Sequence, residues 1–253
     1  MKLNYKSFGS GEPLVILHGL MGMLDNWQSL AKDYAEHFEV YIIDARNHGH
    51  SPHSSEMNYE VMMHDLLEFC HEHDLSEIYL LGHSMGGKTA MKFAQNFADF
   101  VSKLIIADIA PVSYPIRNDI ILKGLESLNF DTIKSRGEAE RLLENYIPEI
   151  GVRQFILKSS YWVGKGKLAL RFNLKAIREN IEIIGEETTD AMFEKETLFI
   201  RGENSNYILN KYQELIDEYF PKNRIVTFPN SGHWLHAEQP KMFLEETLKF
   251  LLK

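Results

Sequence analysis

The chain has 253 residues, of which 44% are hydrophobic, so it can bury a sizeable core as one large domain or two small ones. Its formal net charge of −9 argues against nucleic acid and anionic membranes as partners. No apolar run approaches the roughly 18 residues that cross a bilayer, and the first residues lack the apolar segment of a signal peptide. The single cysteine, Cys70, excludes an internal disulfide and fits a reducing compartment. We expect a soluble, cytoplasmic protein that is a monomer or a homodimer.

The first half of the chain alternates short apolar runs with amphipathic stretches. Residues 2–8 predict an edge strand, and buried strands are predicted at 14–17, 40–43, 78–81 and 101–107. Helices are predicted at 27–38, after Asn58 as a capping residue, and from the end of the third buried strand to about 97. Cys70 falls on the apolar face of the second helix, which favours a core thiol. This alternation predicts βαβ units and a mostly parallel, twisted sheet flanked by helices.

The alternation stops after residue 112. Up to about residue 191 the pattern is helical and charged, with no convincing strand and with apolar stripes at Ile120, Ile121, Leu125 and Leu128 and at Ala139, Leu142, Leu143 and Tyr146. A strand at 197–201, a helix at about 209–219, a strand at 224–228 and a helix from Pro240 then complete the pattern. We predict an α/β core from residues 1–112 and 191–253. Residues 113–190 are predicted to form a helical cap, inserted between two strands over the carboxyl edge of the sheet.

The segment Gly82-His-Ser84-Met-Gly86 follows a predicted strand and precedes a predicted helix. This order is typical of a nucleophile elbow, in which a strained turn exposes the serine hydroxyl and glycines two residues away avoid a clash. The backbone N–H of Met85, at the positive end of the helix, could then bind an oxyanion. A second donor is predicted in His18-Gly19-Leu20, where the turn after a strand can present the N–H of Leu20.

A base for Ser84 is predicted in the loop before the last helix. His233 follows Gly232 there and can reach over the carboxyl edge of the sheet, where sites of open α/β sheets lie. His236 is close to the helix that begins at Pro240, and we interpret it as structural. His48, His50 and His53 share one loop, but their spacing does not indicate a metal site. We predict no metal and no cofactor.

The acid of a triad is usually taken from the loop after strand 197–201, but that loop reads Arg201-Gly-Glu203-Asn-Ser205-Asn. Ser205 stands at the place where an aspartate is expected. Glu203 is one alternative, although it lies close to the end of the strand. Asp108, at the end of the preceding strand, is the better candidate, because a carboxylate there could hold the imidazole of His233 in the right tautomer. Asp44 is interpreted as a loop brace.

These motifs resemble the α/β-hydrolase superfamily along nearly the whole chain. Within it, the chain is similar to the YbfF-type bacterial esterases in the segments Asp25-Asn-Trp27, Asp44-Ala-Arg-Asn-His-Gly49, Gly82-His-Ser-Met-Gly-Gly-Lys88, Asp108-Ile-Ala-Pro111, Arg201-Gly-x-Asn-Ser205 and Gly232-His-Trp-Leu-His-Ala-Glu238. The resemblance implies an acid on the earlier strand, in agreement with Asp108. It also implies cofactor-free hydrolysis of small esters and of acyl-coenzyme A thioesters.

The expected reaction is therefore attack by Ser84 on an ester carbonyl, with His233 as base, Asp108 as its partner and the N–H groups of Leu20 and Met85 around the oxyanion. Met21, Met23 and Trp234 are predicted to bind substrate with Leu20 and Met85, unless these apolar residues belong to the core. Two kinds of alternative remain open. One is a related enzyme with the same triad, a carbon–carbon bond hydrolase or a perhydrolase. The other is a small-molecule receptor on a hydrolase fold.

Overall fold

The computed structural model describes residues 1–115, 119–164 and 167–253. Within these ranges a seven-stranded sheet has the order β1-β3-β2-β4-β5-β8-β9, in which β1 alone is antiparallel to its neighbour. The strands are β1 (Tyr5–Phe8), β2 (Pro13–Leu17), β3 (Glu39–Ile43), β4 (Ile78–His83), β5 (Val101–Ala107), β8 (Thr197–Gly202) and β9 (Asn223–Phe228). The predicted mostly parallel sheet and its edge strand are confirmed.

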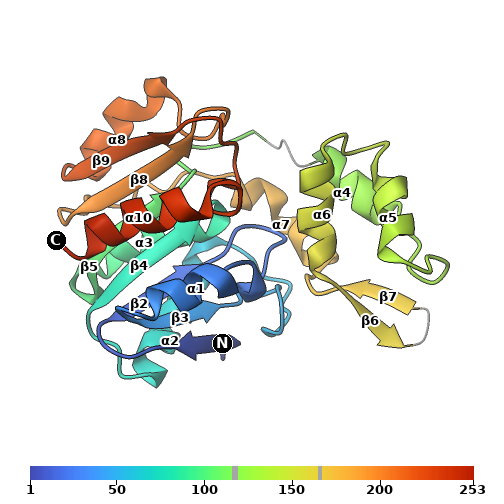
Figure 1. Ribbon diagram of the computed structural model, residues 1–253, viewed down its shortest axis with the longest axis horizontal. Coiled ribbons are helices and arrows are strands. Elements are labelled where there is room, and N and C mark those ends of the chain that lie inside the picture. The colour runs from blue at the N-terminus through green and yellow to red at the C-terminus, as the bar shows by residue number, and fades with distance from the viewer. Residues whose placement is uncertain (116–118, 165–166) are drawn as a thin grey trace.

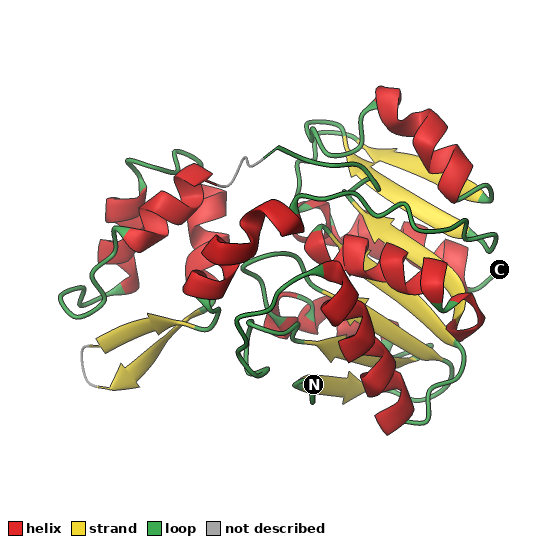
Figure 2. Cartoon of the chain, turned by 180° about the vertical axis from the view of Figure 1, so that it is seen from behind, coloured by secondary structure: helices red, strands yellow, loops and turns green. Residues whose placement is uncertain are grey.

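Helices cover both faces of the sheet because successive side chains of each strand point to opposite sides. Leu14 and Ile16 of β2 pack in the cluster that contains α1 (Gln28–Tyr34) and α10 (Pro240–Leu251), which lie in front of the sheet in Figure 1. Val15 and Leu17 pack in the cluster with α2 (Tyr59–Glu72), α3 (Met85–Asn96) and α8 (Gln213–Tyr219) on the opposite face (Figure 2). Short helices η1 (Leu24–Asn26), η2 (Ala98–Phe100), η3 (Asn210–Tyr212) and α9 (Leu235–Glu238) complete the connections.

The start of α2 and the burial of Cys70 follow the sequence pattern. The Asn58 side chain accepts a hydrogen bond from Val61 N at 2.8 Å and caps the helix. Cys70 is fully buried, and burial raises the pKa of its thiol to about 12, so it stays protonated at neutral pH. In the described part of the chain, no helix is both long and apolar enough to cross a bilayer.

Between β5 and β8 the chain leaves the sheet and builds a separate group of elements, which projects to one side in both overall views (Figures 1 and 2). They are α4 (Asp119–Glu126), α5 (Arg136–Leu143), α6 (Ile150–Lys158), β6 (Ser160–Gly164), β7 (Lys167–Leu170) and α7 (Leu174–Ile184). Their buried side chains share one cluster with Met21, Met57, Tyr59, Met62 and Met85 of the sheet body. The inserted segment thus packs on the sheet body around Met85, next to Ser84.

Two sequence expectations for this segment are wrong. We expected no strand, but β6 and β7 pair as an antiparallel hairpin around the β-forming run Tyr161-Trp162-Val163. Ile120 and Leu142, which we placed on apolar stripes, are 54% and 44% exposed. The stripe residues Leu125, Leu128, Ala139 and Leu143 are buried and hold the helices on one side.

Both ends of the inserted segment are tied together. Tyr114 N donates to Gly185 O at 2.7 Å, and Thr188 N donates to Pro111 O at 3.1 Å. The buried ammonium of Lys88, on α3, donates to the carbonyls of Val112 at 2.8 Å, Gly185 at 3.3 Å and Glu186. One lysine therefore joins α3 to the points where the segment begins and ends.

Candidate active site

Strand register brings Ser84 and Asp108 side by side. His83, the last residue of β4, is paired with Ala107, the last residue of β5, so the residues that follow leave the sheet together. Ser84 N donates to Ala107 O at 3.1 Å, and Asp108 N donates to Ile200 O of β8 at 2.8 Å. Both side chains therefore begin at the carboxyl edge of the sheet, where ligands bind in open α/β folds.

The turn at Ser84 has the strained geometry predicted for a nucleophile elbow. Ser84 has φ 54° and ψ −118°, a backbone conformation that L residues rarely adopt. A Cβ on Gly82 would lie 2.3 Å from Gly86 O, and one on Gly86 would lie 2.5 Å from Leu17 O. The two glycines are thus required by close packing of the turn on β2 and on the start of α3.

His233 reaches the turn from the loop after β9. Its Nε2 is 2.9 Å from Ser84 Oγ, and its Nδ1 is 2.7 Å from Asp108 Oδ2. The His233 side chain is 15% exposed and the Asp108 side chain is fully buried. The structure therefore brings together the three residues that the sequence singled out as nucleophile, base and acid, in a hydrogen-bonded chain.

Asp108 is held by the end of the neighbouring strand β8. It has φ 52°, and its carboxylate accepts hydrogen bonds from Gly202 N at 3.1 Å and from Ser205 Oγ, in addition to His233. These donors fix the position of the carboxylate beside the imidazole. Glu203, the alternative acid, instead accepts from Asn230 N at 2.8 Å and braces the loop that carries His233. Of the two candidates, Asp108 is the one in contact with the imidazole.

Two residues that sequence reasoning missed also contact His233. His83 Nε2 donates to the backbone carbonyl of His233 at 2.8 Å, and burial lowers the pKa of His83 well below its usual value, so that the ring stays neutral. The ring of Tyr207 stacks on the His233 imidazole with centroids 4.1 Å apart. His83 could have been noticed because it lies inside the Gly-x-Ser motif. Tyr207 could not, because nothing in the sequence indicates that its ring stacks on His233, which belongs to another loop.

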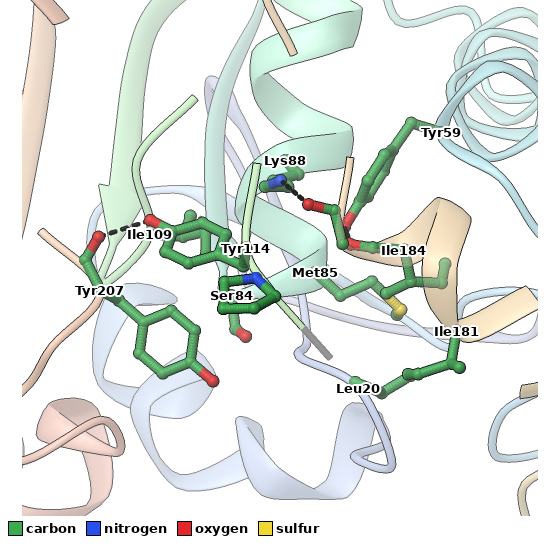
Figure 3. Close-up of a pocket in the computed structure, with 12 residues that line it drawn as sticks. Leu20, Tyr59, Ser84, Met85, Lys88, Ile109, Tyr114, Ile181, Ile184 and Tyr207 are labelled. Atoms are coloured by element: carbon green, nitrogen blue, oxygen red, sulfur yellow. Dashed lines mark hydrogen bonds between the residues drawn. The ribbon is translucent and has the colours of Figure 1, made fainter. Parts of the chain in front are cut away.

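Two cavities open beside Ser84. A small one of about 60 Å³ contains Leu20 and Met85 in its lining (Figure 3). A larger one of about 560 Å³ contains Met21 and Trp234, and Leu20 borders both. Met23 lines neither cavity; it is buried, and its N–H donates to Asn26 Oδ1 at 2.7 Å. Four of the five apolar residues that we expected near the substrate are thus beside Ser84.

The remaining candidate side chains hold loops in place. His236 is buried and stacks on Trp27 with centroids 4.2 Å apart. Asp44 accepts from Leu24 N and His50 N at 2.7 and 2.9 Å, which makes it the predicted loop brace. His48 Nε2 accepts from Met21 N at 3.0 Å. Among the described residues, no group of three or more His, Cys, Asp or Glu side chains is arranged to hold a metal ion.

Comparison with known proteins identifies the family of this chain. Residues 12–240 match the model of the alpha/beta hydrolase fold family, and the chain belongs to that family. A putative esterase/lipase of Haemophilus influenzae is 39% identical over 95% of this chain and 83% of its own length. Esterase YbfF of Escherichia coli is 33% identical over 99% of both chains. A solved structure described as a marine microorganism esterase is 43% identical, with a TM-score of 0.95 over 98% of this chain and 99% of its own.

Proposed function

We propose that this protein is a serine hydrolase that cleaves carboxylic esters through an acyl-enzyme on Ser84. The observation that carries the proposal is the continuous contact from Asp108 through His233 to Ser84 Oγ, with distances of 2.7 and 2.9 Å. Both distances are within the reach needed for proton transfer and for fixing the imidazole tautomer. The esterase and lipase names of the relatives support the same reaction class.

In this mechanism His233 takes the proton of Ser84 as Oγ attacks the ester carbonyl. Asp108 keeps the Nδ1 proton of His233 in place and stabilises the imidazolium. The tetrahedral oxyanion is held by the N–H groups of Leu20 and Met85; removing one such donor typically costs about 3 kcal/mol of transition-state stabilisation. His233 then protonates the leaving alcohol, and water attacks the acyl-enzyme to release the acid.

The inserted segment, residues 113–190, is proposed to act as a cap. Three of its elements, α4, α6 and the turn at Tyr146–Glu149, form one wall of the large cavity, opposite Ser84 and His233. An ester held there is shielded from water on the side of the leaving group. The sheet body supplies the reacting groups, and the cap supplies part of the surface that selects the substrate.

The test is hydrolysis of p-nitrophenyl esters by wild type, Ser84→Ala, Asp108→Asn and Glu203→Gln. Loss of Ser84 should lower kcat by about 10⁶-fold, and Asp108→Asn by roughly 10⁴-fold. Glu203→Gln should stay active, because a glutamine carbonyl can still accept from Asn230 N. Melting temperatures of all four proteins exclude unfolding as the cause.

Each other outcome has a definite meaning. A fully active Ser84→Ala variant would place the activity elsewhere. A wild type that turns over none of the esters would contradict ester hydrolysis and favour a carbon–carbon bond hydrolase, a perhydrolase or a receptor. Acetyl-coenzyme A belongs on the same panel, because the attack on a thioester carbonyl uses the same groups and release of free thiol is easily measured.

A further inference from the structure

Ser84 lies where two cavities of very different size meet. Their volumes are about 60 and about 560 Å³, and Leu20, Ser84 and Tyr207 line both. An ester bound at Ser84 has an acyl half and an alcohol half on opposite sides of its carbonyl carbon. The two halves must therefore be divided between the two cavities, and the position of the general acid determines which half enters which.

His233 borders the large cavity and is absent from the lining of the small one. The oxygen of the leaving alcohol must receive its proton from His233 Nε2, so it has to lie on the His233 side of Ser84. The alcohol half then extends into the large cavity. The acyl half, which stays on Ser84 after the alcohol leaves, extends into the small cavity.

The small cavity is short and mostly apolar. Its walls include aliphatic and aromatic side chains from the sheet body, from the start of the inserted segment and from α7: Leu20, Tyr59, Met85, Ile109, Tyr114, Ile181 and Ile184 (Figure 3). At about 60 Å³ it has room for roughly four water-sized groups. An acyl chain with about two to four carbon atoms would fill it, and a longer chain would have to displace its walls.

Lys88 also lines this cavity, but it does not make the cavity a site for acidic acyl groups. The ammonium has three N–H donors, and it donates to the carbonyls of Val112, Gly185 and Glu186. An acyl carboxylate would have to take a donor from one of these carbonyls and leave that carbonyl unpaired, which is costly in a buried site. Tyr59 OH is likewise used, since it donates to Ile184 O at 2.7 Å.

The large cavity suits a bulky, partly polar alcohol. The cap contributes Ile121, Ile147, Val152 and Phe155 to it, whereas the loop after β8 contributes Asn204, Ser205 and Asn206. Phe155 also packs against Trp234, with ring centroids 5.3 Å apart. An alcohol with many more atoms than the acyl group can be enclosed between these surfaces.

We propose that the small cavity is the acyl site and restricts the enzyme to esters of short, uncharged acids, of acetate to about butyrate length, with large alcohols in the cleft below the cap. The inference rests on the proposed ester hydrolysis and specifies its substrate class. It assigns Ile181 and its neighbours on α7 as specificity-determining residues, although α7 lies in the cap and not in the sheet body.

Two isomeric esters separate the two halves of the substrate. Octyl acetate and ethyl octanoate have the same atoms, but the long chain is on the alcohol in one and on the acid in the other. Wild type should hydrolyse octyl acetate with a kcat/KM roughly 100-fold higher. Equal rates, a preference for ethyl octanoate, or loss of both esters while p-nitrophenyl acetate is still cleaved would overturn the proposal.

A pair of matched variants tests the location of the acyl site. Ile181→Ala enlarges the small cavity and should raise the ratio of octanoate to acetate hydrolysis, on p-nitrophenyl esters, by roughly tenfold or more. Ile121→Ala makes the same change in the large cavity and should leave that ratio unaltered. A shift with Ile121→Ala and none with Ile181→Ala would reverse the assignment. If wild type cleaves no ester, ester hydrolysis itself is refuted, and this result is distinct from a wrong chain length.

Discussion

Asp108 is fully buried, yet its carboxylate is surrounded by donors that come from another strand. Gly202 N, at the end of β8, and Ser205 Oγ, in the loop that follows, bind it together with His233. Ser205 therefore lies on the same side of the imidazole as the acid. The site is built so that a carboxylate from β5 fills a place that β8 could also supply.

This arrangement predicts that the acid can be moved between strands. Asp108→Asn should lower kcat by roughly 10⁴-fold, and adding Ser205→Asp should recover roughly 100-fold of that loss, because the new carboxylate can accept from His233 Nδ1. Asp108→Asn with Ser205→Asn is the control, since it has the same size and no charge. Equal kcat values for the two double variants would show that a carboxylate on β8 cannot reach the imidazole.

Among the residues of the candidate site, those that belong to local motifs could be identified from the sequence. Gly82, Gly86 and Ser84 are recognisable because the elbow is formed within five consecutive residues, and Asp108 was favoured because the β8 loop has no aspartate. Contacts between distant loops leave no such pattern. The stacking of Tyr207 on His233 depends on how two loops meet, and the sequence does not encode it in any spacing.

Among the elements, α3 carries Lys88, whose ammonium joins this helix to the inserted segment. Among the described residues, the hydrogen-bond partners of the buried Lys88 ammonium are three backbone carbonyls. Burial lowers the pKa of this ammonium to about 7, although Glu186 and Glu187 oppose the shift. The rings of Tyr59 and Tyr114 lie 5.6 and 5.0 Å from Nζ. In the unfolded chain the pKa is near 10.5. The ammonium that joins the two ends of the inserted segment is thus held at an electrostatic cost.

The lowered pKa of Lys88 predicts how the stability of the protein changes with pH. Between pH values of about 7 and 10 the unfolded chain keeps the Lys88 proton and the folded chain releases it, so this residue's contribution to stability rises with pH. The stability of wild type relative to Lys88→Met should therefore increase by up to about 1.4 kcal/mol per pH unit, measured by urea denaturation. Lys92→Met is the control on the same helix, because the pKa of Lys92 is raised by Asp190 and Glu60 against the effect of its burial. A flat difference for Lys88→Met would contradict the lowered pKa.

The β6–β7 hairpin shows why elements of the inserted segment are harder to predict than those of the sheet. Strands of the sheet are buried on both faces and appear as continuous apolar runs. The hairpin exposes Trp162 and Val163, and a pair of strands four or five residues long gives a short signal within a helical, charged region. The apolar stripes that contain Ile120 and Leu142 predict buried side chains, but both residues are exposed because these short helices bury only a narrow part of their surface.

Across the whole molecule, neutral histidines hold several loops. Burial lowers the pKa of His48 and His236 to about 3, and it also lowers the pKa of His18 and His83. A neutral imidazole has one donor and one acceptor, which a charged ring does not. His48, for instance, accepts from Met21 N and donates to Arg46 O at 2.9 Å.

The protein should therefore lose stability in mild acid. Below a pH of about 6.5 the unfolded chain protonates these histidines and the folded chain does not, so each contributes a loss of about 1.4 kcal/mol per pH unit until its folded pKa is reached. Urea midpoints measured from neutral pH down to about 5 should fall steeply. His48→Gln can still donate and accept one hydrogen bond each, and it should make the slope of unfolding free energy against pH less steep by about 1.4 kcal/mol per pH unit. His37→Gln, at an exposed site, is the control and should leave the slope unchanged. An unchanged slope in His48→Gln would refute its role.

At the largest scale the sheet could be predicted from the sequence almost completely. The alternation of strands and helices predicts the mostly parallel sheet, its edge strand and the place where the chain leaves the sheet, because βαβ units repeat a simple pattern. The antiparallel direction of β1 was not predicted. The path of the inserted segment could not be predicted in this way. Its contacts with Met21, Tyr59 and Met85 depend on tertiary packing between distant parts of the chain.

The joined ends of the inserted segment have an evolutionary consequence. Pro111 and Thr188, like Tyr114 and Gly185, are hydrogen-bonded to each other, and β5 and β8 pair directly beneath them from Leu104 and Thr197 onward. An inserted segment that leaves and rejoins the sheet body at one point can be lengthened, shortened or exchanged without moving β5 or β8. The sheet body and the inserted segment can therefore change as two modules under partly independent selection.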